Sequence, residues 1–211
     1  MTQGRQQFVL LNLVFVLLFL ILPPACAFAP THAIPNSVLV RDIEGPTIIP
    51  LSVHYLTDEK DIRKTFQGFL ERSNETLMPH GVLLVVWTED RRYNLPSEVD
   101  GRVHRQLLAA HVVKDGTLHV FVPDKVSLEP GDNLLGAQSN QGDRNYIIVR
   151  TTAAKTTLAH EVGHAMGLDH VEDGVRDNVM SQGRNSEEAV FTHDQGEKLR
   201  VGARIFVTRD W

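Results

Sequence analysis

The sequence contains almost no cysteine. Its 211 residues include one, Cys26, which lies in an N-terminal segment that we expect to be removed. The remaining chain therefore cannot form a disulfide, and its fold must be held by a hydrophobic core, to which bound metal ions could add stability. A thiol that blocks an active site before maturation is excluded for the same reason.

A large charge of one sign is also missing. Lys and Arg number 21 against 26 Asp and Glu, and acidic and basic residues are mixed along the chain, with a formal net charge of -5. Because proteins that bind nucleic acids usually carry a basic patch or stripe, no nucleic-acid partner is expected. Internal repeats and low-complexity tracts are absent too. We expect one globular domain and a monomer.

Only one long hydrophobic run is present, and it lies near the N-terminus. A polar start that includes Arg5 is followed by an apolar run over residues 8–22 and by small residues over 25–29. The run is shorter than the roughly 20 residues that span a bilayer, and this order of regions is typical of a secretory signal peptide. We therefore expect residues 1–29 to be a signal peptide. The protein would then be secreted to the extracellular space or the periplasm, without stable membrane association.

The strongest functional signal is the sequence His-Glu-Val-Gly-His-Ala-Met-Gly-Leu-Asp-His, which begins at His160. On a helix, His160 and His164 lie one turn apart on the same face, so both imidazoles can point at one metal ion. Gly167 lets the chain leave the helix through a left-handed conformation, and the turn can bring His170 back as a third ligand. We therefore predict a zinc site made by these three histidines.

Glu161 completes this candidate site. Its carboxylate can reach a water at the open coordination position without taking that position, which is the general-base role in an H-E-x-x-H helix. The opposite face of the helix is apolar, with Leu158, Val162, Ala165 and Met166. The pattern predicts a helix over residues 154–166 with one ligating face and one packing face.

This stretch resembles the zinc signature of the metzincin metallopeptidases, and Gly-Leu-Asp-His at its end looks most like the matrixin-type branch. The family carries a methionine turn beneath the metal, and Met180 is the matching position. The resemblance is specific over about residues 145–182. It implies a zinc-dependent endopeptidase that hydrolyses peptide bonds and binds a protein or peptide substrate as an extended strand along the edge of a sheet.

Some features depart from the matrixin pattern. No cysteine-bearing propeptide segment is present, no tyrosine follows Met180, and the family's histidine array for a structural zinc ion is not evident. Latency and metal content of the matrixin kind are therefore not implied.

The rest of the sequence predicts a single α+β domain over residues 47–211, with an α/β-like upper part, after an extended lead segment over 30–46. The resemblance implies a twisted mixed sheet, an active-site helix, a methionine turn and a C-terminal helix. A strand, helix and strand over residues 47–56, 58–70 and 81–88 read as a βαβ unit, and the last of these strands is apolar throughout, as expected of a central strand buried on both faces.

Five further elements are predicted, two of them with alternatives. Asp115-Gly116 between two apolar runs indicates a β-hairpin over residues 112–122. Strands are expected over 134–139 and 146–150. The first would be the substrate-binding edge, where Gly136 permits close backbone approach, or else an internal strand with a bulge. Residues 97–107 form a short helix or an irregular insertion. Thr192 and Gln195 form a capping box that opens the last helix.

Other interpretations compete at the metal. Glu187 or Glu188 could be the third ligand in place of His170, as in a gluzincin. A secreted zinc-containing binding protein of the same fold without turnover is the alternative function, although Glu161 argues against it, because a purely structural zinc site needs no base. A calcium ion is possible at Asp173 with Asp177, or at Asp124 with Asp132. A second zinc ion could be built from the scattered histidines, namely His32, His54, His80, His104, His111, His119 and His193.

Overall fold

The computed structural model describes residues 45–127, 134–141, 144–172, 175, 177–182 and 186–211. The expected signal peptide and most of the expected lead segment lie outside the described residues. Among the described helices, none is long and apolar enough to cross a membrane.

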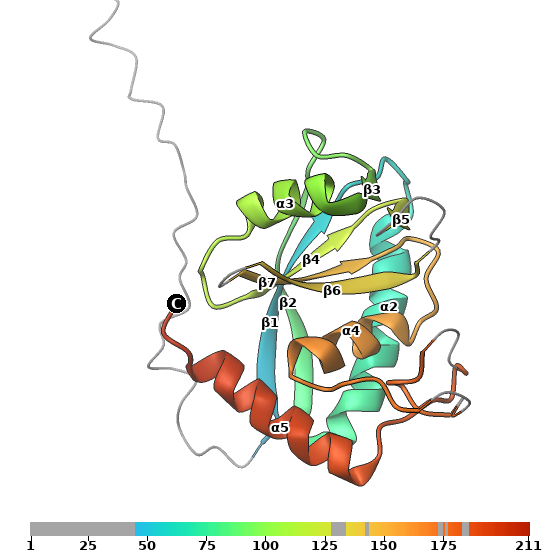
Figure 1. The fold of residues 1–211 in the computed structure, drawn as a ribbon, viewed down its shortest axis with the longest axis vertical. Coiled ribbons are helices and arrows are strands. Elements are labelled where there is room, and N and C mark those ends of the chain that lie inside the picture. The colour runs from blue at the N-terminus through green and yellow to red at the C-terminus, as the bar shows by residue number, and fades with distance from the viewer. Residues whose placement is uncertain (1–44, 128–133, 142–143, 173–174, 176, 183–185) are drawn as a thin grey trace, which may run out of the picture. The chain divides into compact units, whose positions relative to one another are not determined.

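A five-stranded sheet forms the centre of the domain (Figure 1). Its strand order is β2 (Val82–Arg91), β1 (Thr47–Tyr55), β4 (Leu118–Val122), β7 (Arg144–Val149) and β6 (Gly136–Gln141). The first four strands run parallel, whereas β6 is antiparallel to β7 and ends the sheet at one edge. The predicted mixed sheet in an α+β domain is therefore confirmed.

The predicted βαβ unit is present, but its second strand lies elsewhere than expected. β1 and β2 pair in parallel through the crossover helix α2 (Ile62–Leu77). β2 is an edge strand and not a central one, and its Trp87 side chain is 52% exposed. Trp87 occupies a bulge opposite the Leu51–Ser52 step. An apolar run shows that a strand forms but cannot show whether one or two neighbours pair with it.

The hairpin prediction for residues 112–122 is wrong. Residues 112–117 lead from helix α3 (Gly101–His111) into β4, and β4 is already paired in parallel with β1 and β7 on its two sides. Asp115 nevertheless makes a turn, because its side chain accepts hydrogen bonds from the backbone N–H and the hydroxyl of Thr117. The Asp-Gly signal predicted the turn correctly and its partner strand incorrectly.

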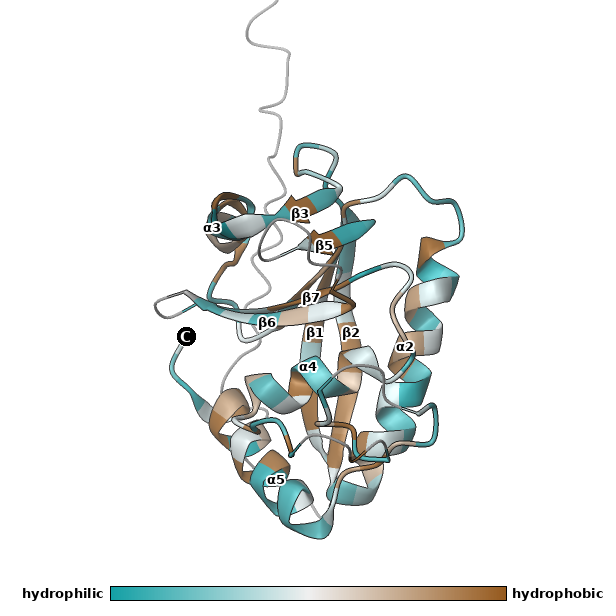
Figure 2. Ribbon diagram, turned by 45° about the vertical axis from the view of Figure 1, so that its right-hand side comes forward, coloured by the Kyte–Doolittle hydropathy of each residue, from teal (hydrophilic) through white to brown (hydrophobic). Residues whose placement is uncertain are grey.

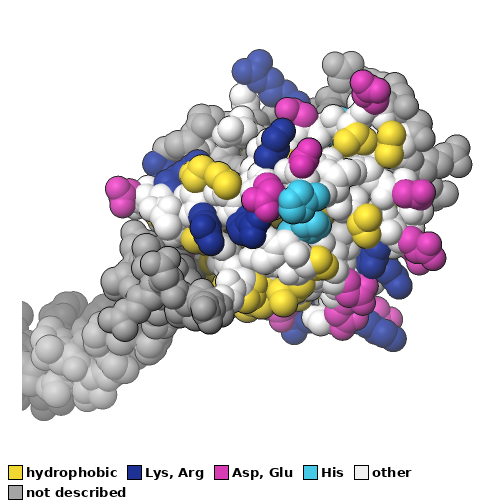
Figure 3. All heavy atoms as spheres, turned by 90° about the horizontal axis from the view of Figure 1, so that it is seen from below, with side chains coloured by type: hydrophobic (Ala, Val, Ile, Leu, Met, Phe, Trp, Pro, Cys, Tyr) yellow, Lys and Arg dark blue, Asp and Glu magenta, His cyan; other side chains and the backbone are white. Residues whose placement is uncertain are grey.

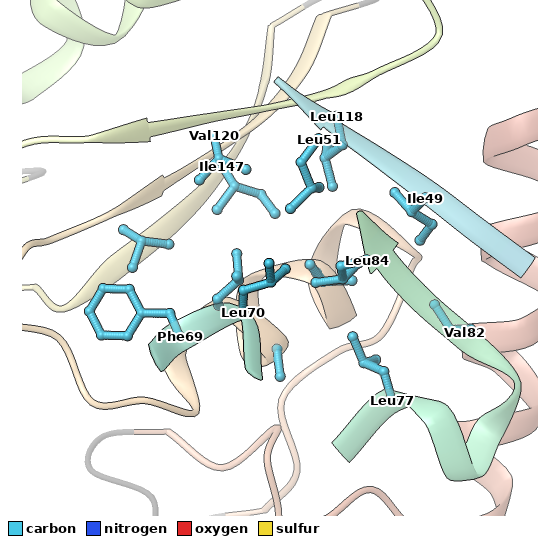
Figure 4. Close-up of a cluster of buried hydrophobic side chains, with 14 of the residues drawn as sticks. Ile49, Leu51, Phe69, Leu70, Leu77, Val82, Leu84, Leu118, Val120 and Ile147 are labelled. Atoms are coloured by element: carbon cyan, nitrogen blue, oxygen red, sulfur yellow. The ribbon is translucent and has the colours of Figure 1, made fainter. Parts of the chain in front are cut away.

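The two faces of the sheet bury different side chains. Ile49, Leu51 and Val53 of β1 belong to the core shared with α2, α4 (Thr157–Ala165) and α5 (His193–Thr208). Figure 4 shows Ile49 and Leu51 among leucine, valine and phenylalanine side chains. The helices turn their hydrophobic sides to this core (Figure 2). On the other face, α3 covers Phe121 and Tyr146 together with the two-stranded sheet of β3 (Glu98–Asp100) and β5 (Lys125–Ser127).

The region over residues 97–107 is a strand followed by a helix. β3 ends at Asp100, and α3 starts at the next residue. Of the two predicted alternatives, the helix is the correct one, although it begins later than Ser97. The Thr192 and Gln195 capping box is confirmed, since each side chain hydrogen-bonds the other residue's backbone.

The surface shows no large area of one charge on the face that Figure 3 presents. Acidic and basic side chains alternate there, with hydrophobic side chains between them. This distribution follows from the mixed charges along the sequence.

Helix α5 packs closely against the end of α4, and a glycine makes this possible. A Cβ atom at Gly202 would overlap the backbone carbonyl of Met166, whereas a Cβ atom at Gly68 in α2 would meet nothing within 4 Å. The same substitution should therefore have opposite effects at the two positions.

We expect Gly202→Ala to lower the free energy of unfolding by about 2 kcal/mol, because the two helices must move apart. Gly68→Ala, the matched control, should raise it by up to about 1 kcal/mol, since alanine favours the helix. Urea unfolding followed by circular dichroism measures both. Equal effects of the two substitutions would contradict the proposed packing.

Candidate metal centre

Three imidazoles converge at one point beside the sheet. The Nε2 atoms of His160 and His164 are 3.1 Å apart, and the Nε2 atom of His170 lies 3.0 Å from that of His164 and 3.2 Å from that of His160. Ligands of a tetrahedral ion with bonds of about 2 Å are separated by roughly 3.3 Å. The three ring nitrogens therefore lie at nearly the spacing of three zinc ligands.

The Nδ1 atoms of His160 and His164 are hydrogen-bonded to backbone carbonyl groups. His160 Nδ1 lies 2.6 Å from the carbonyl oxygen of Val179, and His164 Nδ1 lies 2.8 Å from that of Leu168. A carbonyl can only accept, so each Nδ1 carries the proton and each Nε2 keeps its lone pair free. Burial lowers the pKa of His160 to about 4, and it also lowers the pKa of His164. Both rings are thus held in the neutral form that binds metals.

The chain turn after α4 brings the third histidine to the other two. Gly167 has a φ of 91°, which confirms the predicted left-handed exit from the helix. The N–H of Leu168 donates to the carbonyl of Gly163 and closes the turn at 2.9 Å. Beyond His170, the N–H of Val171 donates to the carbonyl of Met180 at 3.0 Å. Hydrogen bonds on both sides therefore fix the segment that carries His170.

Glu161 lies between the histidines and the edge of the sheet. It is only 5% exposed, and the backbone N–H of Gln138 in β6 donates to its carboxylate. Burial raises the pKa of Glu161 to about 8, and the hydrogen bond from Gln138 opposes this increase. The raised pKa favours the protonated carboxyl group, and a cation held by the histidines would lower it and favour the charged form that can accept a proton.

Gly136 lets the edge strand approach this carboxylate. A Cβ atom at Gly136 would lie 2.8 Å from Glu161 Oε1 and 2.7 Å from a methyl carbon of Thr157. The sequence indicated a close approach at Gly136, and the structure shows that α4 is what approaches. Of the two alternatives for this strand, the edge position is the one observed.

Met180 packs against helix α4, which carries His160 and His164. Its side chain is fully buried, and its sulfur would be 2.5 Å from a Cβ atom at Gly163, the residue just before His164. Gly163 was not recognised from the sequence as part of the site. It stands inside the H-E-x-x-H motif, at a position where the motif alone accepts any residue.

A pair of amide side chains holds the methionine turn, and the sequence analysis missed it as well. Asn178 and Gln195 exchange two side-chain hydrogen bonds of 2.8 and 3.1 Å, and Asn178 Oδ1 also accepts from the N–H of Met180. Gln195 is at the same time the capping residue of α5. The methionine turn is therefore tied to the start of the last helix.

Alternate backbone groups of the edge strand β6 point away from β7. The N–H of Arg150 donates to the carbonyl of Leu135, so the odd-numbered residues of this segment pair with β7. In an antiparallel ladder alternate residues point outward. Gly136, Gln138 and Asn140 therefore turn their backbone groups to the open side, in agreement with the bond from Gln138 to Glu161.

The competing metal ligands are not brought together. Among the described residues, His160, His164 and His170 are the one group of three or more candidate ligands close enough for a shared ion, and Glu187 and Glu188 are not part of it. His54 and His119 form a buried pair instead, 2.9 Å apart, with Asp90 bonded to His54. The two calcium hypotheses each involve a residue outside the described ones, Asp132 or Asp173.

Comparisons with known proteins show what this architecture resembles. No family model matches the sequence, and a search of curated proteins gives no match. Among solved structures, an archaemetzincin from Methanopyrus kandleri is similar with a TM-score of 0.54 and 19% identity, over 78% of this chain and 99% of that one. Metalloproteinase-II from Bacteroides fragilis is similar with a TM-score of 0.53 and 16% identity, over 74% of this chain.

The chain spans about half of the Bacteroides protein, 53% of its length. At these identities the likeness concerns the fold alone, and it gives no support to the matrixin-type branch in particular. The described domain has a metzincin-like α+β fold.

Proposed function

We propose that this protein is a zinc-dependent endopeptidase. The observation that carries the proposal is the convergence of three Nε2 atoms with the buried Glu161 carboxylate beside them. Three neutral imidazoles suit zinc and leave a fourth position open, as in catalytic sites, whereas structural sites close that position with a fourth protein ligand. A zinc ion held there would supply a Lewis acid for the scissile carbonyl and lower the pKa of a bound water.

Glu161 acts as the general base and then as the general acid. It takes a proton from the attacking water and delivers it to the leaving amine. The hydrogen bond from the Gln138 N–H keeps its carboxylate beside the histidines. With no tyrosine after Met180, donors for the developing oxyanion come from the backbone of β6.

The substrate pairs with β6 as an added strand. The outward backbone groups of Gly136, Gln138 and Asn140 support this mode, because main-chain hydrogen bonds bind a peptide without regard to its sequence. Secretion as a monomer, directed by residues 1–29, belongs to the same proposal. Placement in the matrixin-type branch rests only on the Gly-Leu-Asp-His sequence at 167–170.

A zinc-containing binding protein without turnover is the second candidate. It would use the same three histidines, and its substrate edge would serve to hold a peptide. Glu161 separates the two functions, since burying a carboxylate beside the ligands costs stability that a binding protein has no need to lose.

We expect Glu161→Gln to retain zinc and to lower kcat/KM for peptide cleavage by about a hundredfold or more, because an amide cannot accept the proton. The measurements are a quenched-fluorescence peptide assay and the zinc content of the same sample. Glu71→Gln, on the exposed side of α2, is the matched control and should leave both unchanged. Full activity of Glu161→Gln would remove the proposed mechanism.

We expect the purified protein to hold one zinc ion per chain and His164→Ala to lose it, since two imidazoles and a water bind the ion far less tightly. Elemental analysis after dialysis measures the content. Removing zinc from the unchanged protein with a chelator should lower its Tm, because the ion binds only the folded state. His111→Ala, at a partly exposed histidine of α3 outside the cluster, is the control. Equal zinc content in both variants would contradict the assignment of His164.

A further inference from the structure

A pocket of about 360 Å³ adjoins the histidine cluster. It lies where β6 and β7 meet the end of α4 and the residues after α5, whose end is marked C in Figure 1. The lining residues are Gln138, Asn140, Asn145, His164, Ala165, Gly167 and Arg209. His164 belongs to both the pocket and the histidine cluster, so a group bound in the pocket would lie next to an ion held by the three histidines.

The charge of the pocket comes from Arg209. The other lining side chains are neutral, none of them is acidic, and a zinc ion beside His164 would add positive charge. Among the described residues, no carboxylate forms an ion pair with Arg209. Its guanidinium carbon instead lies 5.7 Å from the ring centre of Trp211, which packs edge-on against Phe206 of α5. The aromatic ring holds the cation near the pocket and leaves its hydrogen-bond donors for a ligand.

Hydrogen bonds hold the amide side chains that line the pocket in place. Gln138 Nε2 donates to Asn145 Oδ1 at 2.8 Å, and Asn145 Nδ2 donates to the carbonyl of Ala165 at 3.3 Å. These bonds join β6, β7 and α4 at the wall of the pocket. Fixed amide groups and an arginine that line the same pocket favour a planar, anionic ligand.

We propose that this pocket is a carboxylate-binding subsite that makes the enzyme prefer substrates with an acidic residue near the cleaved bond, with Arg209 as the specificity-determining residue. The inference rests on the proposed peptidase function. β6 runs from Gly136, beside Glu161, to Asn140, beside the pocket. A substrate strand antiparallel to β6, the commoner and more stable pairing, places residues on the amino side of the cleaved bond over the pocket.

A peptide's terminal carboxylate offers the same chemistry. If the substrate ran parallel to β6, its carboxyl side would lie over the pocket, and Arg209 would bind the chain end. Two sets of peptide pairs distinguish an acidic side chain from a chain end. The first set compares Glu with Gln at each of the three positions before the cleaved bond. The second compares a free with an amidated C-terminus two or three residues after that bond.

We expect the unchanged protein to cleave the best Glu peptide with a kcat/KM about fivefold above its Gln partner, an effect typical of one charge pair in a partly open site. Arg209→Ala should bring this ratio to about one, and Arg209→Glu should reverse it. Arg204→Ala, an exposed arginine of α5 outside the pocket, is the matched control and should keep the ratio. Added salt should reduce the preference of the unchanged protein.

Other results would overturn the proposed subsite or assign it a different ligand. A ratio of one in the unchanged protein for the Glu and Gln pairs and also for the free and amidated pairs, or an unaltered preference in Arg209→Ala, overturns the proposal. A preference only for the free C-terminus supports the carboxylate subsite and assigns the ligand to the chain end.

Binding of the same peptides to zinc-loaded Glu161→Gln, measured by calorimetry, tests the subsite without turnover. Cleavage of the Gln peptides with no charge preference would leave the peptidase function standing and remove the subsite. A preference for the Glu peptides in binding, with no cleavage by the unchanged protein, would support the subsite and remove the peptidase function.

Discussion

The hydrogen bond from His160 Nδ1 to the carbonyl of Val179 is the contact on which the rest of the site depends. It joins the helix that carries two candidate ligands to the methionine turn, and at 2.6 Å it fixes both the tautomer and the orientation of the ring. A metal site needs its ligands aligned before the ion arrives. In this protein, residues far apart in the sequence provide that alignment.

Two further contacts hold the methionine turn in place. Met180 fits only because Gly163 has no side chain, and Asn178 is bonded to Gln195 at the start of α5. Movement of the last helix would therefore reach His160 through two contacts. The close packing of α5 on Met166 limits such movement.

One strand accounts for both the chemistry and the proposed selectivity. β6 reaches Glu161 through Gly136 and Gln138, and its far end meets the pocket that contains Arg209. In the proposed function, a peptide paired with this edge would have its backbone held beside the Glu161 carboxylate and a side chain near Arg209. In that function the strand would add no catalytic side chain, and its backbone would set where the cleaved bond lies relative to Glu161 and the histidines.

The sequence by itself determined the elements whose causes are local. The His160 to His170 motif, the left-handed Gly167 and the capping box at Thr192 each depend on spacing within a few residues, and each is present as predicted. Tertiary structure decided what depends on neighbours distant in the chain. It made β2 an edge strand, gave β4 two parallel partners where a hairpin was expected, and brought Asn178 to Gln195 and Arg209 to His164. Periodicity records which face of an element is buried but not which element buries it.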